Sequence, residues 1–351
     1  MRRRATLALL AAGAFAAADA APKKAKAKPA TAVRHAANTY GARDDLRAFA
    51  VDVAARRALD AAWIVKHLGQ AQKLEAVQRL MMPAPAGTAK NWNAYRDRFV
   101  EPRRIAAGAA FWQSSERWLA DAHERCGVPP HIVVGIVGVE TFYGRITGGF
   151  RVVDALATLA FDFPTGRKDR SPFFRDELEE FLVYCDREGA DPQALKGSFA
   201  GAMGWPQFMP GSINRYALDF DGDGHVDLNN SLADIVGSVA HYLAQHGWRR
   251  DEPTHFRVTP PDDAAERARL LEPDIVPTFS ALQFGEHGAL LEPAGLAYDD
   301  RLALVELQNG EQGAPTYIAG TPNFYAVTRY NWSSYYALAV IALGEAVQRA
   351  R

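Results

Sequence analysis

Glu140 lies near the end of the segment His131–Arg145, HIVVGIVGVETFYGR, and is the strongest candidate for acid–base chemistry. Eight apolar or glycine residues precede it, and no lysine or arginine occurs in the segment before Arg145. Partial desolvation at the end of such a run raises the pKa of a carboxyl group and keeps it protonated. A protonated carboxylic acid is what the departure of a glycosidic oxygen requires. The alternative is a structural Glu paired with Arg145 or Arg151, and the segment alone does not decide between the two.

The glycine-rich segment Lys196–Ser212, KGSFAGAMGWPQFMPGS, is a candidate ligand-binding loop. It contains four glycines and two prolines and shows no regular periodicity. Glycine lets a backbone approach a ligand closely. Ser198 and Gln207 could hydrogen-bond sugar hydroxyl or acetamido groups, while Trp205 and Phe208 could offer apolar faces. The alternative is a tightly packed structural turn, which explains each single aromatic residue better.

The segment Asp219–Asn230, DFDGDGHVDLNN, has the pattern of a calcium-binding loop. Aspartates stand at positions 1, 3 and 5 and Gly224 at position 6. Position 12 is Asn230 rather than the usual bidentate Glu, so the last ligand is expected downstream. The expected ligands are Asp219, Asp221, Asp223, the backbone carbonyl of His225, and Asp234. Such a site would brace structure, although an acidic surface turn is the alternative.

The segment Asn323–Tyr336, NFYAVTRYNWSSYY, combines many aromatic rings with Arg329 and Asn331. Saccharide grooves use this combination, because the C–H faces of a sugar pack on rings while its hydroxyl groups need directional partners. Core packing explains some of these rings equally well. The density of tyrosines, each with a polar tip, favours a partly exposed groove.

Mainly helical elements are expected to position these segments, which makes the fold class mainly α (α+β). Residues 256–320 contain short β-type runs with several Pro and Gly and predict a small β-containing insertion. Residues 131–141 are ambiguous, because Ile-Val-Val favours a buried strand whereas Pro129, Pro130 and Gly144 favour a helix. Apolar residues at three- and four-residue intervals predict helices within 43–80, 105–125, 176–187, 231–246 and 335–350.

The N-terminus has the pattern of a secretory signal peptide over residues 1–20. Arg2, Arg3 and Arg4 precede an apolar stretch that ends in Ala18-Asp19-Ala20. The stretch is shorter than the roughly 20 residues of a spanning helix, so we expect no stable membrane insertion. Residues 21–40 are rich in Ala, Lys and Pro and predict a disordered linker. Together these features predict a periplasmic protein.

The bulk composition is that of a globular protein, with 351 residues of which 48% are hydrophobic. The formal net charge is −1, which excludes a global basic field that would draw the chain to nucleic acid. Cys126 and Cys185 could pair in an oxidising compartment or remain free thiols, and the sequence leaves this open.

Five motifs in a fixed order resemble the lytic murein transglycosylases of the B type. The resemblance runs from about residue 43 to the C-terminus. The motifs are VPPHIVVGIVGVET at 128–141, DALATLAFDFP at 154–164, KGSFAGAMGWPQFMP at 196–210, DFDGDGH at 219–225 and NFYAVTRYN at 323–331. Several long motifs in order are far more specific than one short pattern.

The resemblance implies a lysozyme-like helical core at 111–255 and 321–351, an additional helical domain at 41–110 and a small β domain at 256–320. It also implies an EF-hand-like loop that holds structural Ca²⁺, with no organic cofactor. Glu140 matches the catalytic carboxylate of the family. The substrate-binding positions match Ser198, Gln207, Tyr330, Asn331 and Tyr336, and the calcium ligands match Asp219, Asp221, Asp223, His225 and Asp234.

The activity implied by the resemblance is cleavage of the MurNAc-β-1,4-GlcNAc bond of peptidoglycan glycan strands with formation of 1,6-anhydro-MurNAc. Glu140 would act first as acid and then as base, and attack by the sugar's own hydroxyl would need no second carboxylate. One alternative is a hydrolytic muramidase, for which Asp154 and Asp162 are the only nearby second acids. The other is a non-catalytic, calcium-dependent wall-binding protein.

Overall fold

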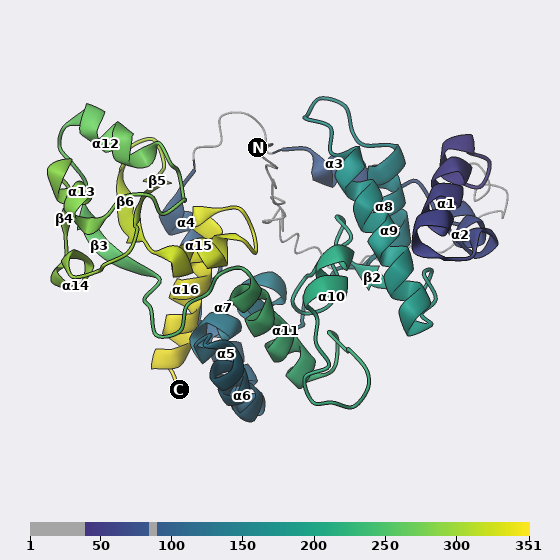
Figure 1. Cartoon of the computed structure of the whole chain (residues 1–351), viewed down its shortest axis with the longest axis horizontal. Coiled ribbons are helices and arrows are strands. Elements are labelled where there is room, and N and C mark those ends of the chain that lie inside the picture. Colours follow the sequence, from purple (N-terminus) through teal and green to yellow (C-terminus); the bar gives the residue numbers. More distant parts are fainter. Residues whose placement is uncertain (1–38, 84–89) are drawn as a thin grey trace, which may run out of the picture. The chain divides into compact units, whose positions relative to one another are not determined.

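The computed structural model describes residues 39–83 and 90–351, which form two compact units (Figure 1). The described residues of the first unit are 90–146 and 216–351, and those of the second are 39–83 and 147–215. The units thus divide the chain at other positions than the expected domain boundaries. Helical periodicity shows which face of a helix is apolar, but not which other helix covers that face.

The predicted signal peptide and most of the predicted linker lie outside the described residues. The end of that linker belongs to the second unit instead. Thr39 forms a β-bridge with Gln72, and Tyr40 is buried and donates a hydrogen bond to Asp162 at 2.7 Å. No helix among the described residues combines the length and apolarity needed to cross a membrane.

The first unit is built around α7, which runs from Pro130 to Thr141 and packs against α16, α5, α6 and α11. The helices of this part are α4 (Trp92–Asp97), α5 (Pro102–Ser114), α6 (Glu116–Cys126), α7, α11 (Leu232–Gln245), α15 (Pro322–Thr328) and α16 (Ser334–Arg349). Figure 1 shows α5, α6, α7 and α11 gathered beside α16. The prediction of a mainly helical fold is confirmed.

The ambiguous segment 131–141 is a helix, because Pro130 at its first position is preorganised for helical φ. Its residues from Ile132 to Val139 are all buried, so β-branched side chains here satisfy core packing rather than strand pairing. Two glycines let α7 and α16 approach closely. A Cβ on Gly135 would lie 2.2 Å from the carbonyl oxygen of Val340, and one on Gly344 would lie 2.0 Å from that of His131.

A four-stranded antiparallel sheet lies between α11 and α15 in sequence, with the order β4-β3-β6-β5. This confirms the predicted β-containing insertion, although the short helices between its strands were not predicted. The strands are β3 (His255–Thr259), β4 (Leu290–Leu291), β5 (Ala303–Asn309) and β6 (Gly313–Gly320), and the helices are α12 (Ala264–Leu271), α13 (Ala281–Glu286) and α14 (Pro293–Leu296). Its own small core includes Phe284, Leu302 and Leu304.

The second unit is centred on α8 and α9, which lie side by side (Figure 1). Its elements are α1 (Asp44–Arg57), α2 (Ala61–Gly69), α3 (Glu75–Met81), β1 (Phe150–Arg151), α8 (Val152–Phe161), α9 (Ser171–Glu188), β2 (Lys196–Gly197) and α10 (Pro210–Tyr216). The glycine-rich segment forms the loop between β2 and α10, as predicted. Cys185 in this unit and Cys126 in the first unit are free thiols.

Candidate active site

Glu140 occupies the last turn of α7, directly before an unusual change of backbone direction. Phe142 and Tyr143 adopt positive φ angles of 51° and 55°, and Gly144 follows at 79°. Left-handed conformations are costly for bulky side chains and persist only where packing holds them. Tyr143 is buried and stacks on Phe111 with ring centroids 5.3 Å apart. The turn that ends the Glu140 helix is therefore held by the core.

Arg104 of α5 strengthens the same turn. Its Nη1 donates to the carbonyl oxygen of Gly138 at 2.5 Å, and its guanidinium lies 4.5 Å from the ring centroid of Phe142. The contact satisfies a carbonyl at the helix C-terminus, where a cation is electrostatically favourable. Sequence analysis did not identify Arg104, because the pairing of α5 with α7 is not visible in either segment.

The carboxyl group of Glu140 is half-buried and has a single hydrogen-bond partner in the described chain. The hydroxyl of Tyr336 on α16 donates to its Oε1 at 2.5 Å. Burial raises the pKa of Glu140 to about 7, and the hydrogen bond from Tyr336 opposes that rise. Glu140 is consequently protonated in a substantial fraction of molecules at neutral pH, as a general acid must be.

The structural alternative for Glu140 required a pair with Arg145 or Arg151. No ion pair involves Glu140 within residues 39–83 and 90–351. The guanidinium of Arg145 lies 4.8 Å from the ring centroid of Phe142, and Arg151 forms an ion pair with Asp154 at 2.7 Å. Both arginines are therefore engaged elsewhere.

A row of tyrosines leads to Glu140. The ring of Tyr330 stacks on that of Tyr336 with centroids 6.2 Å apart, and Tyr242 contacts Tyr330 at 4.9 Å. Burial raises the pKa of Tyr330 and of Tyr336 well above the ordinary value. Both phenols are therefore hydrogen-bond donors at any physiological pH. Beside them, Asn331 is buried, and its Oδ1 has no hydrogen-bond partner among the described residues.

Tyr95 of α4 is a further residue of this region that sequence analysis missed. Its hydroxyl is buried and has no hydrogen-bond partner in the described part of the chain. Burial, together with the nearby charge of Glu140, raises the pKa of Tyr95 to about 12. None of the recognised motifs contains Tyr95, and its position depends on the packing of α4 against α16.

Ser198 and Gln207 lie in the second unit, in the loop between β2 and α10. The Oγ of Ser198 accepts hydrogen bonds from the backbone N–H groups of Ala200 and Ala202, at 3.3 and 3.0 Å. Gln207 has a positive φ of 53°, and its Nε2 donates to the carbonyl oxygens of Thr147 and Gly204 at 3.1 and 2.9 Å. The groups left for a ligand are thus the Ser198 hydroxyl hydrogen and the Gln207 Oε1.

The aromatic residues of that loop do not all face outward. Phe208 is 2% exposed and pairs with Met203 through two backbone hydrogen bonds of 2.8 and 3.1 Å. The expectation that Phe208 offers a face to a sugar is therefore wrong, because its side chain is buried.

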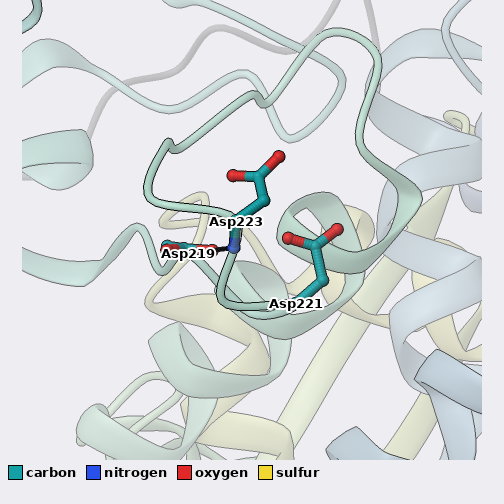
Figure 2. Close-up of side chains that lie close together, drawn as sticks. All are labelled: Asp219, Asp221 and Asp223. Carbon is teal, nitrogen blue, oxygen red and sulfur yellow. Dashed lines mark hydrogen bonds between the residues drawn. The ribbon is translucent and has the colours of Figure 1, made fainter.

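The predicted calcium loop brings three carboxylates together, as Figure 2 shows. Ligand oxygens of Asp219, Asp221 and Asp223 all lie within 4.8 Å of one another. Asp219 also accepts hydrogen bonds from the backbone N–H groups of Gly222, Asp223 and Gly224 at 2.8 to 3.1 Å. These bonds fold the loop around its first aspartate, and three carboxylates so close together fit a hard cation.

Asp234, on the first turn of α11, lies outside that group. It is buried, and its two oxygens accept the backbone N–H groups of Phe220 and Asp227, both at 2.8 Å. In this structure Asp234 ties the two ends of the loop to α11. His225 is exposed and its N–H donates to Asp223 at 2.9 Å, which leaves its carbonyl oxygen available.

Comparison with known proteins gives a family match over most of the chain. The model of a family described as "Transglycosylase SLT domain" matches residues 41–345. The chain is 41% identical to the membrane-bound lytic murein transglycosylase B of Escherichia coli K12 over 293 residues, which cover 81% of this chain and 77% of that protein.

Solved structures give the same result. The E. coli lytic transglycosylase Slt35 in complex with bulgecin A is 38% identical, with a TM-score of 0.77 over 90% of this chain and 96% of that one. The same protein in complex with calcium has a TM-score of 0.76 at 38% identity, over 88% and 94% of the two chains. SltB3 of Pseudomonas aeruginosa in complex with NAG-anhNAM-pentapeptide is 28% identical, with a TM-score of 0.70 over 87% and 79%.

Proposed function

The chain belongs to the SLT-domain family of lytic murein transglycosylases, and from that premise we propose that Glu140 is its single catalytic carboxylate. The observation that carries the proposal is the environment of Glu140. Its carboxyl group is half-buried, is bound by the hydroxyl of Tyr336, and has a pKa raised by burial to about 7. This combination gives one group that can both donate and accept a proton near neutral pH.

The reaction uses that group twice. Glu140 gives its proton to the glycosidic oxygen as the bond from C1 of MurNAc to that oxygen breaks. The C6 hydroxyl of the same MurNAc then attacks C1, and the proton of that hydroxyl passes to the Glu140 carboxylate. The products are a free GlcNAc hydroxyl and a 1,6-anhydro-MurNAc end, and Glu140 is again protonated. The attack is intramolecular, so no water is activated.

The remaining predicted residues would bind the glycan. The unpartnered Oδ1 of Asn331 is a buried acceptor that an acetamido N–H of the substrate would satisfy. Tyr330 would supply a ring face and a hydroxyl beside Tyr336. Within the second unit taken by itself, the Oε1 of Gln207 and the hydroxyl of Ser198 are the groups that remain for sugar hydroxyls.

A hydrolytic muramidase would need a second carboxylate to activate water or form a covalent intermediate. The two candidates from the sequence are occupied. Asp154 is buried and is bound by Arg151 and by the backbone N–H of Gln72 at 2.9 Å. Asp162 accepts from the side chains of Tyr40, Arg43 and Lys73 at 2.7 to 3.0 Å. Each of these acids is thus held by a cation and by further hydrogen-bond donors, unlike Glu140, which favours lytic transfer.

The acidic loop is proposed to hold a structural calcium ion. Its support is the convergence of Asp219, Asp221 and Asp223, together with the calcium complex of the related Slt35. The carbonyl of His225 would add a fourth oxygen. Asp234 would be the last ligand, and its two backbone hydrogen bonds also hold the loop on α11. Calcium in this loop would stabilise the fold and take no part in proton transfer.

Export to the periplasm is proposed from the signal-peptide pattern at residues 1–20 and from the kind of substrate. Glycan strands of peptidoglycan lie outside the cytoplasmic membrane. The related E. coli protein is named as membrane-bound. Expression of the full chain followed by N-terminal sequencing of the periplasmic form would test export, because cleavage after Ala20 is expected.

Digestion of purified peptidoglycan by the mature protein, with Glu140→Gln as the matched variant, tests the catalytic proposal. The released muropeptides are analysed by mass spectrometry. Products lighter than the hydrolytic ones by one water molecule, and absent with the variant, are expected. Reducing-end products would establish hydrolysis instead. Binding to peptidoglycan without any released product, by both proteins alike, would make the chain a wall-binding protein.

A further inference from the structure

The β5–β6 hairpin of the small sheet contacts the helix that binds Glu140. Between Leu307 and Asn309 the pairing register of the two strands shifts, so that two residues of β6, Ala314 and Pro315, lie opposite Gln308 alone. Such a bulge disrupts the ladder locally, and the backbone N–H and carbonyl of Gln308 have no register partner on β6. In this hairpin both are bound by one side chain of α16. The N–H of Gln308 donates to the hydroxyl oxygen of Tyr335 at 2.6 Å, and that hydroxyl donates to the Gln308 carbonyl at 3.3 Å.

The end of the same hairpin also holds α4. Asn309 forms a β-bridge with Asn91, and its Oδ1 accepts the backbone N–H of Asn93 at 3.2 Å. The N–H of Gly310 donates to the carbonyl oxygen of Lys90 at 2.9 Å. The helix α4 has only 6 residues. So short a helix is unstable in isolation, so its position depends on contacts of this kind.

The helices that the hairpin contacts, α16 and α4, both carry tyrosines close to Glu140. Tyr336 follows Tyr335 on α16 and binds Glu140 at 2.5 Å. Tyr95 of α4 packs edge-on against Tyr335, with ring centroids 6.0 Å apart and an angle of 83°. The Tyr95 hydroxyl is one of the buried groups that lack a hydrogen-bond partner among the described residues.

We propose that the β5–β6 hairpin is a positioning element of the active site: its end fixes α4 and the start of α16, and thereby sets where the tyrosines of these two helices face Glu140. The inference rests on the catalytic role of Glu140 proposed above. It assigns the small β sheet a part in the reaction that is exerted through Tyr335.

Tyr335→Phe tests this link, because it removes only the hydroxyl and keeps the ring that packs against Tyr95. Tyr298→Phe is the matched control, since the hydroxyl of Tyr298 donates to Glu252 at 2.7 Å in the same unit. With peptidoglycan as substrate, we expect Tyr335→Phe to lower kcat about 5-fold, as the loss of one hydrogen bond does. We expect KM to change little and the control to keep the wild-type kcat.

The pH profile separates positioning from a general loss of structure. The hydrogen bond from Tyr336 lowers the pKa of Glu140, so a displaced Tyr336 would move the fall in activity to higher pH. Asn309→Ala, which removes the side-chain acceptor for the N–H of Asn93 on α4, is expected to act in the same direction. A uniform loss at every pH, or an unchanged kcat in both variants, would overturn the proposal.

A double-mutant cycle completes the test. In Tyr335→Phe combined with Tyr336→Phe, the loss of kcat should be smaller than the product of the two single losses, because both act on one hydrogen bond. Losses that simply multiply would overturn the positioning role while leaving the proposed function intact. Failure of the wild-type protein to release anhydro products would overturn the proposed function itself.

Discussion

The raised pKa of Glu140, which suits its proposed catalytic role, has a cost in stability. Its pKa is 4.5 in its ordinary state and about 7 in the folded protein. Below pH 4.5 the group is protonated in both states and costs nothing. As the pH rises through 7 the folded protein must carry an ionised, half-buried carboxylate, and the stability associated with the protonated form is lost.

Glu140→Gln is therefore expected to be more stable than the wild type at high pH. The difference between the two pKa values, 4.5 and about 7, limits the gain in unfolding free energy to about 3.4 kcal/mol. Partial solvent access of the carboxyl group lowers the expected gain to about 2 kcal/mol at pH 8. The gain should be small at pH 4.5. Chemical denaturation at both pH values, with the exposed Glu286→Gln as control, measures it. Equal stability of the two proteins at pH 8 would contradict the raised pKa.

Tyr336→Phe removes the hydroxyl that stabilises the ionised form of Glu140. Because that bond lowers the pKa of Glu140, its loss raises the pKa further. Activity of the wild type should fall as the pH rises through about 7, since the protonated acid is lost. In the variant the fall should lie about one pH unit higher. An unchanged midpoint in the profile of kcat against pH would show that another group controls the profile.

The close contact between α7 and α16 decides where Glu140 and Tyr336 meet. Gly135→Ala would place a methyl group 2.2 Å from the carbonyl oxygen of Val340, so the helices must separate. We expect a loss of about 1–3 kcal/mol in the free energy of unfolding, with a loss of activity. Gly285→Ala is the control, because a Cβ there meets nothing within 4 Å and lies in α13. It should be neutral or stabilising, as alanine is in helices. Similar losses for both variants would exclude the packing explanation.

Local sequence patterns predicted the elements better than their pairing. The proline at position 130 and the apolar periodicity of 231–246 and 335–350 are local signals, and the structure has helices there. The break at Ser115, which divides the predicted helix 105–125 into α5 and α6, leaves no such signal. The site depends on contacts between distant segments. Glu140 meets Tyr336 across 196 residues, and Tyr95 joins them from a third segment.

At the level of the whole molecule, the family resemblance predicted a grouping of the helices and strands into domains, which apolar periodicity alone did not. The spacing of Asp219, Asp221 and Asp223 predicted their convergence, because a loop with a fixed pattern is a local structure. The division into two units was not predicted, since it depends on which helices cover one another. Gln207 illustrates the limit. Its type suggested a ligand role, but only the structure shows that its Nε2 already donates to the backbone of Thr147 and of Gly204.

The proposed calcium loop, Asp219–Asn230, would link a local charge pattern to the stability of the whole fold. Three carboxylates whose oxygens lie within 4.8 Å of one another repel when no cation is bound. Asp221 alone of the three accepts no backbone hydrogen bond, since its one hydrogen bond comes from the hydroxyl of Ser231 at 3.3 Å. Asp221→Asn therefore changes the charge of the loop while leaving its backbone hydrogen bonds in place.

Two opposite effects on thermal unfolding are expected from Asp221→Asn. In excess chelator its Tm should lie above that of the wild type, because one repelling charge is gone. With calcium at 100 times its Kd the wild type should gain about 2.7 kcal/mol, and the variant much less. The exposed Asp262→Asn serves as control for the loss of a single charge. If calcium leaves the Tm of the wild type unchanged, or raises both proteins equally, the loop is an acidic turn held by its own backbone and by Asp234.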